Sequence, residues 1–444
     1  MYYKRKIDSE LLLWSKEEHR KPLLLRGARQ VGKSSSVREL AKQFEYFAEV
    51  NFESQRQLHT VFSGDINPRN ISNDISLFLN VPIVPGKTLL FFDEIQSCPA
   101  AISSLRFFYE QYPELHLIAA GSLLEFALSE LPSFGVGRVR SIFMYPFSFY
   151  EFLSASGEDL LLKAVKGASP EQPLSDLVHS KLNSLLKKFM IIGGMPEVVS
   201  NYVSGKDLLA CQQILDDLLI SLQADFSKYK ARVPSVLIQE VFSSVVRQSG
   251  NRFVYSRAMP ETGFRKIKDS LELLIMAGLV IPVSHTSANG LPLGAETDFE
   301  KRKMLLLDTG LFQRISGLNI SELLLSDDFK VINRGALAEL FAGLELLKST
   351  SCYQQAKLYY WHREARSSNA EVDYLLQKDD TIIPIEIKSG KRGSMQSLFL
   401  FLKEKGLELG VRSSMENFSR YDKIEVYPLY ALSNIVQLTE VLKC

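Results

Sequence analysis

The chain has 444 residues, of which 46% are hydrophobic and 23% are charged. Because this length exceeds what a single hydrophobic core usually serves, we expect two to four domains. The net charge of +1 excludes a globally basic nucleic-acid-binding protein and an acidic disordered chain, and it leaves room for a local basic patch.

The cysteines and the N-terminus indicate a cytoplasmic protein. Cys98, Cys211, Cys352 and Cys444 are scattered without metal-ligand spacing, which is typical of free thiols in a reducing compartment. The N-terminus lacks the apolar core of a signal peptide, and every apolar run is far shorter than the about 20 residues that cross a bilayer. We therefore expect no membrane partner.

The most specific motif is G-x-x-x-x-G-K-S at residues 27–34, between a predicted strand at 22–25 and a predicted helix from Ser35. The backbone N–H groups of such a turn, with the positive end of the following helix, bind nucleotide phosphates. We expect ATP here, with Lys33 on the β- and γ-phosphates and Ser34 on Mg²⁺. The predicted nucleotide-binding residues are Gly27, Ala28, Arg29, Gln30, Val31, Gly32, Lys33, Ser34 and Ser35.

Two carboxylates end the next clear apolar strand, which we predict over residues 89–92. Asp93 is the expected Mg²⁺ ligand, and Glu94 is the expected group that polarises the attacking water. Because a pure binding switch does not need the second acid, Glu94 favours hydrolysis.

These motifs resemble the AAA+ branch of the P-loop ATPases, which implies an α/β ATPase core with a parallel sheet over residues 1–150. The resemblance implies that Ser122, after a predicted strand at 115–120, senses the γ-phosphate. The alternative for Ser122 is an ordinary turn at a strand end.

Arg138 precedes a predicted strand at 139–145. The same resemblance makes it an arginine finger that reaches the nucleotide of a neighbouring subunit, so that the active form is a homo-oligomer. The alternative is a surface arginine in a glycine-rich loop.

Residues 151–228 have mostly helical periodicity, which predicts a helical lid. The stretch Gly-Gly-Met-Pro-Glu at 193–197 resembles an element of prokaryotic AAA-type ATP-binding proteins whose C-terminal domain has no settled function. We expect a tight turn between two helices there, with Pro196 at a first helical position.

Residues 229–325 carry predicted helices near 237–248 and 261–278, then predicted strands at 278–281 and 301–307. This order is typical of a winged helix. Arg257, Arg265, Lys266 and Lys268 gather near the second helix, where they could lie along DNA phosphates. The alternatives are an inert spacer, a protein-docking module and an ordinary solvated helix face.

The last segment, residues 326–444, holds a second group of acids. Glu339 lies in a predicted helix, Asp373 in a predicted strand at 371–376, and Glu386 and Lys388 on one face of a predicted strand at 384–388. Carboxylates suit Mg²⁺, and Lys388 could orient a metal-bound water or steady the charge of the transition state.

This pattern resembles the PD-(D/E)xK nuclease superfamily. The resemblance implies that Glu339, Asp373 and Glu386 bind metal and that Lys388 is catalytic. The alternatives are a sheet edge decorated with charges and a nuclease-like fold whose catalysis is idle.

Together the segments predict an AAA+ ATPase coupled through a lid and a winged helix to a nuclease-like α/β domain. The main hypothesis is that ATP turnover drives nucleic-acid binding or cleavage. The alternative is an ATP-dependent regulatory switch or protein-binding module with an inactive nuclease-like domain, and a slow assembly scaffold is a third. Glu94 and the C-terminal acids favour the first hypothesis, and the near-zero net charge favours the second.

Overall fold

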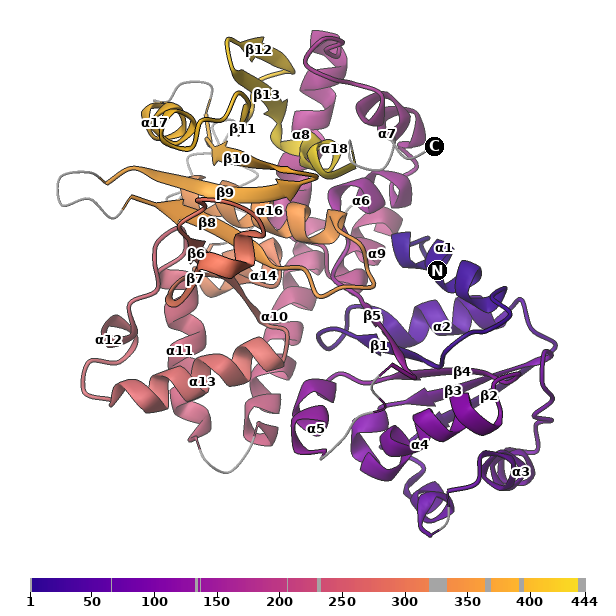
Figure 1. Ribbon diagram of the computed structural model, residues 1–444. Coiled ribbons are helices and arrows are strands. Elements are labelled where there is room, and N and C mark those ends of the chain that lie inside the picture. Colours follow the sequence, from indigo (N-terminus) through magenta and orange to yellow (C-terminus); the bar gives the residue numbers. More distant parts are fainter. Residues whose placement is uncertain are drawn as a thin grey trace. The chain divides into compact units, whose positions relative to one another are not determined.

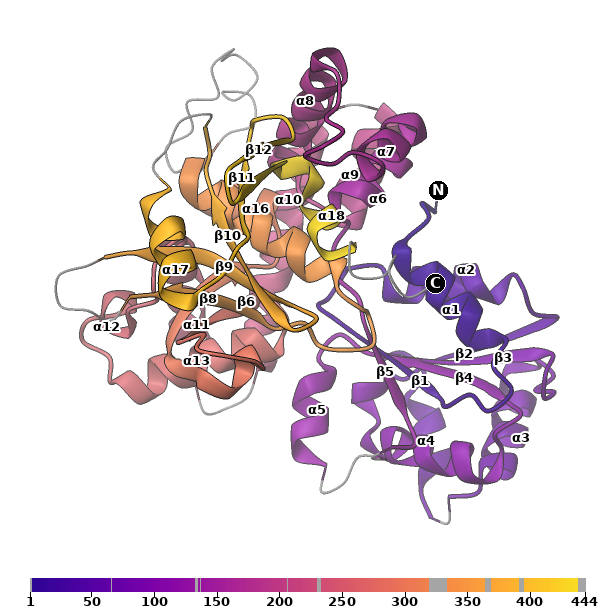
Figure 2. The ribbon, with the colours of Figure 1, turned by 45° about the horizontal axis from the view of Figure 1, so that its top comes forward.

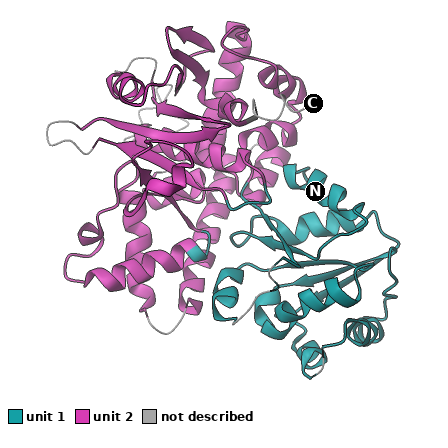
Figure 3. Ribbon diagram, viewed as in Figure 1, with its two compact units in different colours: residues 1–146, 276–278, 352–355 teal, residues 147–275, 279–351, 356–444 magenta. Residues whose placement is uncertain are grey.

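The chain divides into two compact units in the computed structural model, which describes residues 2–64, 66–131, 135, 137–205, 207–229, 233–318, 334–363, 369–390 and 395–437. The first unit consists of residues 1–146, 276–278 and 352–355, and the second of residues 147–275, 279–351 and 356–444 (Figures 1 and 3). Each unit therefore combines segments that lie far apart in the sequence.

The first unit is built on a parallel five-stranded sheet, as predicted for an α/β ATPase core. The strand order is β2-β3-β4-β1-β5. The strands are β1 (Leu23–Arg26), β2 (Tyr46–Asn51), β3 (Thr88–Asp93), β4 (His116–Ala120) and β5 (Arg140–Phe143). Every residue of β3 and β4 is buried, which explains why these strands read as continuous apolar runs rather than as alternating patterns.

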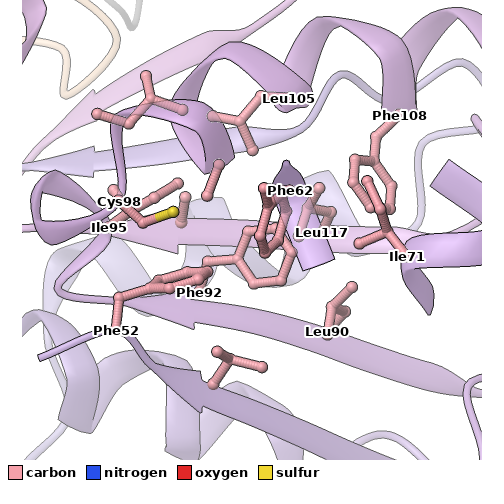
Figure 4. Close-up of a cluster of buried hydrophobic side chains, with 14 of the residues drawn as sticks. Phe52, Phe62, Ile71, Leu90, Phe92, Ile95, Cys98, Leu105, Phe108 and Leu117 are labelled. Carbon is pink, nitrogen blue, oxygen red and sulfur yellow. The ribbon is translucent and has the colours of Figure 1, made fainter. Parts of the chain in front are cut away.

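Helices pack on this sheet around an aromatic core. They are α1 (Lys6–Ser15), α2 (Lys33–Ala41), α3 (Pro68–Leu79), α4 (Pro99–Gln111) and α5 (Leu124–Glu130). Figure 4 shows Phe92 of β3 surrounded by Phe52, Phe62 and Phe108, with ring centroids 5.4, 5.7 and 6.0 Å away in edge contacts. Such aromatic pairs add to the stability that burial of their area already gives.

The strand order also positions the candidate site. The carboxyl ends of neighbouring parallel strands meet at one edge of the sheet, where ligands of open α/β sheets bind. At this edge β1 leads into the phosphate loop, β3 ends in Asp93, and β4 leads to Ser122. Residues about 90 positions apart in the sequence therefore converge.

The second unit contains an eight-stranded sheet of order β12-β13-β11-β10-β9-β8-β6-β7. Its strands are β6 (Val280–Thr286), β7 (Thr297–Leu306), β8 (Leu358–His362), β9 (Glu371–Lys378), β10 (Thr381–Ile387), β11 (Gly410–Ser414), β12 (Ser419–Tyr421) and β13 (Ile424–Pro428). The hairpin β6–β7 comes from the segment expected to be a winged helix, and β6 also pairs in parallel with β8. The segments 229–325 and 326–444 thus share one sheet, because β8 takes up the edge of β6 that a free hairpin would leave unpaired.

The second unit contains the helices predicted over residues 151–228, near 237–248 and 261–278, and around Glu339, together with others. They are α6 (Phe149–Ala155), α7 (Asp159–Lys166), α8 (Asp176–Ile192), α9 (Pro196–Gly205), α10 (Leu208–Ala224), α11 (Ser235–Arg247), α12 (Tyr255–Ala258), α13 (Phe264–Met276), α14 (Thr309–Ile315), α16 (Arg334–Ser349), α17 (Gln396–Lys405) and α18 (Leu432–Gln437). The predicted turn before Pro196 is present, and the buried Asp308 accepts hydrogen bonds from Gly194 N at 2.6 Å and from Gly310 N at 2.9 Å. One carboxylate therefore holds the turn and also caps α14.

A β-bulge interrupts β9 beside β8. Tyr359 pairs with Leu375, but Trp361 pairs with Val372, so two steps along β8 match three along β9. Val372 and Leu375 consequently belong to the same buried hydrophobic cluster as Phe401 of α17, which lies against β9 in Figures 1 and 2. Strict alternation would send these two side chains to opposite faces, so the bulge resets which β9 residues face α17.

Cys98, Cys211 and Cys352 are free thiols, and Cys444 lies outside the described residues. Among the helices of the described residues, none has the length and apolar character that would let it cross a membrane.

Candidate functional site

The phosphate loop has the backbone that its glycines require. Gly27 has φ 144°, and a Cβ atom there would lie 2.2 Å from the carbonyl oxygen of Met144. Gly32 has φ 100° at the start of α2, a conformation that other residues rarely adopt. The loop therefore turns sharply from β1 into α2 and directs N–H groups at the helix N-terminus.

Lys33 lies in the first turn of α2 and is buried. Its ammonium donates hydrogen bonds to the carbonyl oxygens of Gly27 at 2.9 Å and Ala28 at 2.8 Å. Burial lowers the pKa of Lys33 to about 8, and the negative charges of Glu94 and Asp93 oppose that shift. The lysine is thus held inside the loop, in reach of the phosphates that such loops bind.

Ser34 and Asp93 are brought together from α2 and β3. The Ser34 hydroxyl donates to the Asp93 carboxylate, with Oγ 2.9 Å from Oδ1 and 3.0 Å from Oδ2. Burial raises the pKa of Asp93, while the Ser34 hydrogen bond lowers it. A hydroxyl beside a carboxylate, both oxygen donors next to the phosphate loop, fits Mg²⁺.

Glu94 and Ser122 contact each other directly. The Ser122 hydroxyl lies 3.1 Å from Glu94 Oε2, and Gln96 Nε2 donates to the same oxygen at 2.6 Å. Glu94 has φ 48°, in the left-handed region that costs a non-glycine residue energy. The strain lies in the Glu94 backbone, and two hydrogen bonds, one of them from the predicted sensor, hold its carboxylate.

Arg5 also belongs to this site, although the sequence did not single it out. Its side chain is buried, with the residue 6% exposed. Nη1 donates to the carbonyl oxygen of Val31 in the phosphate loop at 3.2 Å, and Nη2 donates to that of Tyr145 at 2.8 Å. Only the fold brings Arg5 to the loop, and one arginine in a basic N-terminal segment carries no sequence signal for this role.

Arg138 lies outside this cluster of contacts. Its side chain is 51% exposed and forms an ion pair with Glu110 of α4, with Nε 2.5 Å from Oε1. Neighbouring residues Phe134 and Val136 of the predicted finger loop lie outside the described residues. The finger role therefore stays a prediction.

Basic side chains on α12 and α13 are exposed. They are Arg257, Arg265, Lys266 and Lys268. Lys268 Nζ lies 6.0 Å from the ring centre of Phe264. These residues are accessible to an anionic partner.

The predicted C-terminal acids gather around a lysine that the sequence did not single out, Lys303 of β7. Its Nζ lies 2.7 Å from Glu339 Oε1, 2.5 Å from Glu371 Oε1 and 3.7 Å from Asp373 Oδ1. The other oxygen of Asp373 accepts a hydrogen bond from Ile387 N at 2.8 Å. Lys303 and Glu371 belong to no recognisable sequence motif. Lys303 reaches these acids because β7 pairs with β6, and β6 pairs with β8.

Glu386 and Lys388 pair with each other. Lys388 Nζ lies 2.5 Å from Glu386 Oε1, as their predicted placement on one face requires. Burial, followed by the charge of Asp373, raises the pKa of Glu386 to about 7, and Lys388 and Lys303 oppose the shift.

Glu339 and Lys303 have shifted pKa values with related causes. Burial raises the pKa of Glu339 to about 7, against the attraction of Lys303. Burial alone would lower the pKa of Lys303, but the charges of Glu339, Asp373 and Glu371 raise it above its ordinary value. Within the part of the chain that the structure describes, no three His, Cys, Asp or Glu side chains are arranged to hold a metal ion.

Three protein families match successive segments of the chain. Residues 19–153 match the AAA domain family, residues 183–322 a domain of unknown function (DUF8612), and residues 334–432 another domain of unknown function (DUF4143). The first segment is an AAA-type P-loop ATPase domain, and its match includes the phosphate loop, Asp93, Glu94 and Ser122. A search of curated proteins finds no match.

Solved structures that match the chain are distant in sequence. The Walker-type ATPase PABY2304 of Pyrococcus abyssi is 15% identical, with 71% of this chain and 96% of that chain covered and a TM-score of 0.45. The Aeropyrum pernix ORC1 protein in complex with DNA is 13% identical, with 73% and 95% covered and a TM-score of 0.29. PCH-2 of C. elegans is 15% identical, with 62% and 69% covered and a TM-score of 0.24.

Proposed function

We propose that the chain hydrolyses ATP with Mg²⁺ and that its nucleotide state controls what the rest of the chain binds. The observation that carries the proposal is the convergence of Lys33, Ser34, Asp93 and Glu94 at one edge of the parallel sheet. The ATPase domain supplies the nucleotide-binding part, and the positions of the two acids support hydrolysis.

Each of the residues at this edge of the sheet has its own role in the proposed reaction. Lys33 neutralises phosphate charge, and Ser34 with Asp93 would hold Mg²⁺, which screens the phosphate charge when bound. Glu94 accepts a proton from the attacking water. Ser122, hydrogen-bonded to Glu94, couples the position of that carboxylate to the state of the site.

The test measures ATP binding and phosphate release in matched variants. Lys33→Ala should lose ATP binding, whereas Lys42→Ala, which changes an exposed lysine just past the end of the same helix, should not. Glu94→Gln should bind ATP and release almost no phosphate. Unchanged affinity of Lys33→Ala would refute the phosphate-loop assignment, and normal turnover by Glu94→Gln would mean that another group activates the water.

For the controlled partner we propose nucleic acid, bound by the exposed basic side chains of α12 and α13. The lid, winged-helix and nuclease-like assignments of the segments after residue 150 belong to this proposal. An ATP-dependent switch whose nuclease-like domain does not cut is favoured over cleavage by one observation: Lys303 lies among the acids expected to bind metal.

The test for this partner is fluorescence anisotropy with a labelled duplex of random sequence over a range of salt concentrations. Lys266→Glu should weaken binding and lower the salt slope by about 1, because it removes one phosphate contact. Lys403→Glu alters an exposed lysine of α17 and is the matched control. Equal binding by both variants would argue for a protein partner.

A further inference from the structure

The Lys303 ammonium is enclosed by carboxylates from two other elements. Glu339 comes from α16, and Glu371 and Asp373 come from β9. The Lys303 side chain is only 2% exposed, and Glu339 is 11% exposed. A lysine this deeply buried is rare unless it is paired, so the acids and the ammonium depend on one another.

The sheet and the packing around it hold the Lys303 ammonium among these carboxylates. Lys303 lies within β7, where it pairs with Val283 of β6, and its Nζ lies 5.2 Å from the ring centre of Tyr360. To move the ammonium into solvent, the strand or the packing around it would have to open. The cation is therefore a fixed part of the sheet.

A divalent ion shared by Glu339 and Asp373 would have to lie beside this ammonium. Like charges repel strongly where little water screens them. Three of the four oxygens of these two acids already have partners: Lys303 contacts Glu339 Oε1 and Asp373 Oδ1, and Ile387 N–H donates to Asp373 Oδ2. Glu386, the third predicted metal ligand, has a buried oxygen, Oε2, without a hydrogen-bond partner among the described residues, and a single oxygen does not make a metal site.

We propose that Lys303 is a built-in cation of the C-terminal acidic cluster, and that Glu339 and Asp373 bind it in place of a divalent metal ion. The residues of the expected metal site therefore do not fit a metal while Lys303 is present. The cluster joins residues 280–306 to residues 334–378, so the two domains of unknown function share one buried ion network. This inference does not depend on ATP hydrolysis.

The test is a Mn²⁺ titration of the full chain without nucleotide, with free Mn²⁺ followed by electron paramagnetic resonance. All proteins carry Asp93→Asn, which removes the candidate metal ligand of the ATPase domain. The chain with Lys303 should show no stoichiometric Mn²⁺ binding, and Lys303→Met should gain one Mn²⁺ per chain. Adding Asp373→Asn to Lys303→Met should abolish the gain.

Lys301→Met is the matched control, because Lys301 lies on the same strand and pairs with Asp298. It should bind no Mn²⁺. The proposal is overturned if the chain with Lys303 binds one Mn²⁺ that Asp373→Asn removes, or if a folded Lys303→Met gains none.

If Lys303→Met does not fold stably, the pairing of Lys303 with Glu339 can still be tested through thermal stability. The double variant Lys303→Met/Glu339→Gln removes one charge of each sign from the cluster. It should unfold at a higher temperature than Lys303→Met, since fewer buried carboxylates are left without a cation. A double variant no more stable than Lys303→Met would contradict the mutual dependence and with it the proposal.

Discussion

The Glu94 carboxylate is fixed in this site by its backbone conformation and by its neighbours. A left-handed backbone at Glu94 has an energetic cost, and hydrogen bonds from Gln96 and Ser122 hold the side chain in that position. A Cβ at Gly121 would lie 2.2 Å from Gln96 Oε1, so a side chain there would displace the Gln96 amide that donates to Glu94. The position of the proposed base therefore depends on Gln96 and Ser122 as well as on its own backbone.

Arg5 gives a prediction at the same scale. Arg5→Met should lower the free energy of unfolding by about 1–3 kcal/mol, because the buried carbonyl of Val31 loses its donor. It should also raise the KM for ATP more than it lowers kcat, since Arg5 positions the loop and touches no reacting atom. Arg5→Lys should restore part of the affinity. Steady-state ATPase kinetics and urea unfolding check these outcomes.

Arg20→Met provides the control for Arg5. Arg20 also donates to two carbonyl oxygens, those of Glu17 and Glu114, but Glu114 precedes β4, at the sheet edge opposite the phosphate loop. This variant should change stability without changing KM. An equal change of KM in both variants would mean that Arg5 acts only through stability.

At the scale of elements, His116 connects β4 to the end of α1. Its Nε2 lies 2.9 Å from the carbonyl oxygen of Ser15, and its ring packs edge-on against Trp14 and Phe44. Burial lowers the pKa of His116 to about 4 from an ordinary value of 6.5. The folded chain therefore keeps this histidine neutral where the unfolded chain protonates it.

This shift predicts a pH dependence of stability. Above pH 6.5 the histidine is neutral in both states, and its contribution is complete. As the pH falls from 6.5 towards 4, the unfolded state binds a proton that the folded state does not, and up to about 3 kcal/mol is lost. His116→Gln should flatten this part of the curve in urea unfolding followed by circular dichroism, and His19→Gln, at an exposed position, is the control. An unchanged slope in His116→Gln would assign the acid sensitivity to other groups.

The β9 bulge is the second feature at the element scale. It adds one residue to β9 opposite β8, so that Val372 and Leu375 turn the same way. Asp373 lies inside this irregularity and reaches Lys303 and the N–H of Ile387 from there. The orientation of the acid thus depends on the register between two strands and not on its position in β9 alone.

At the scale of the whole molecule, Arg138 is the residue predicted to reach the nucleotide of a second copy of the chain. In one chain it pairs with Glu110 on the surface, an ion pair of about 0–1 kcal/mol that a better partner can replace. If Arg138 reaches the nucleotide of a second copy, turnover per chain should rise with protein concentration. Arg138→Ala should remove that rise.

Phosphate release measured from dilute to concentrated protein checks this prediction. Glu110→Gln is a useful companion variant, because it removes the ion pair with Glu110 while keeping the arginine, and it should not lower the turnover of concentrated protein. A flat profile for the wild-type chain would leave Arg138 as a surface arginine.

The sequence by itself determined the nucleotide-binding part of this protein. The phosphate loop is a local motif whose glycines and lysine act within eight consecutive residues, and the apolar run before Asp93 predicts its strand directly. Helices such as α11 and α13 were predictable for the same reason, since the periodicity of each lies within one continuous segment. The parallel five-stranded sheet then follows from strands that alternate with helices.

Only the tertiary structure decided which distant side chains meet. Arg5 reaches the phosphate loop, and Lys303 enters the acidic cluster, through strand pairing and packing that leave no mark on the neighbouring sequence. The acids at 339, 373 and 386 could be predicted as a group because they match a known pattern. The ion pairs of Glu339 and Asp373 with a lysine from another segment could not be predicted, because long-range pairing such as that of β6 with β8 depends on all the strands of the sheet at once.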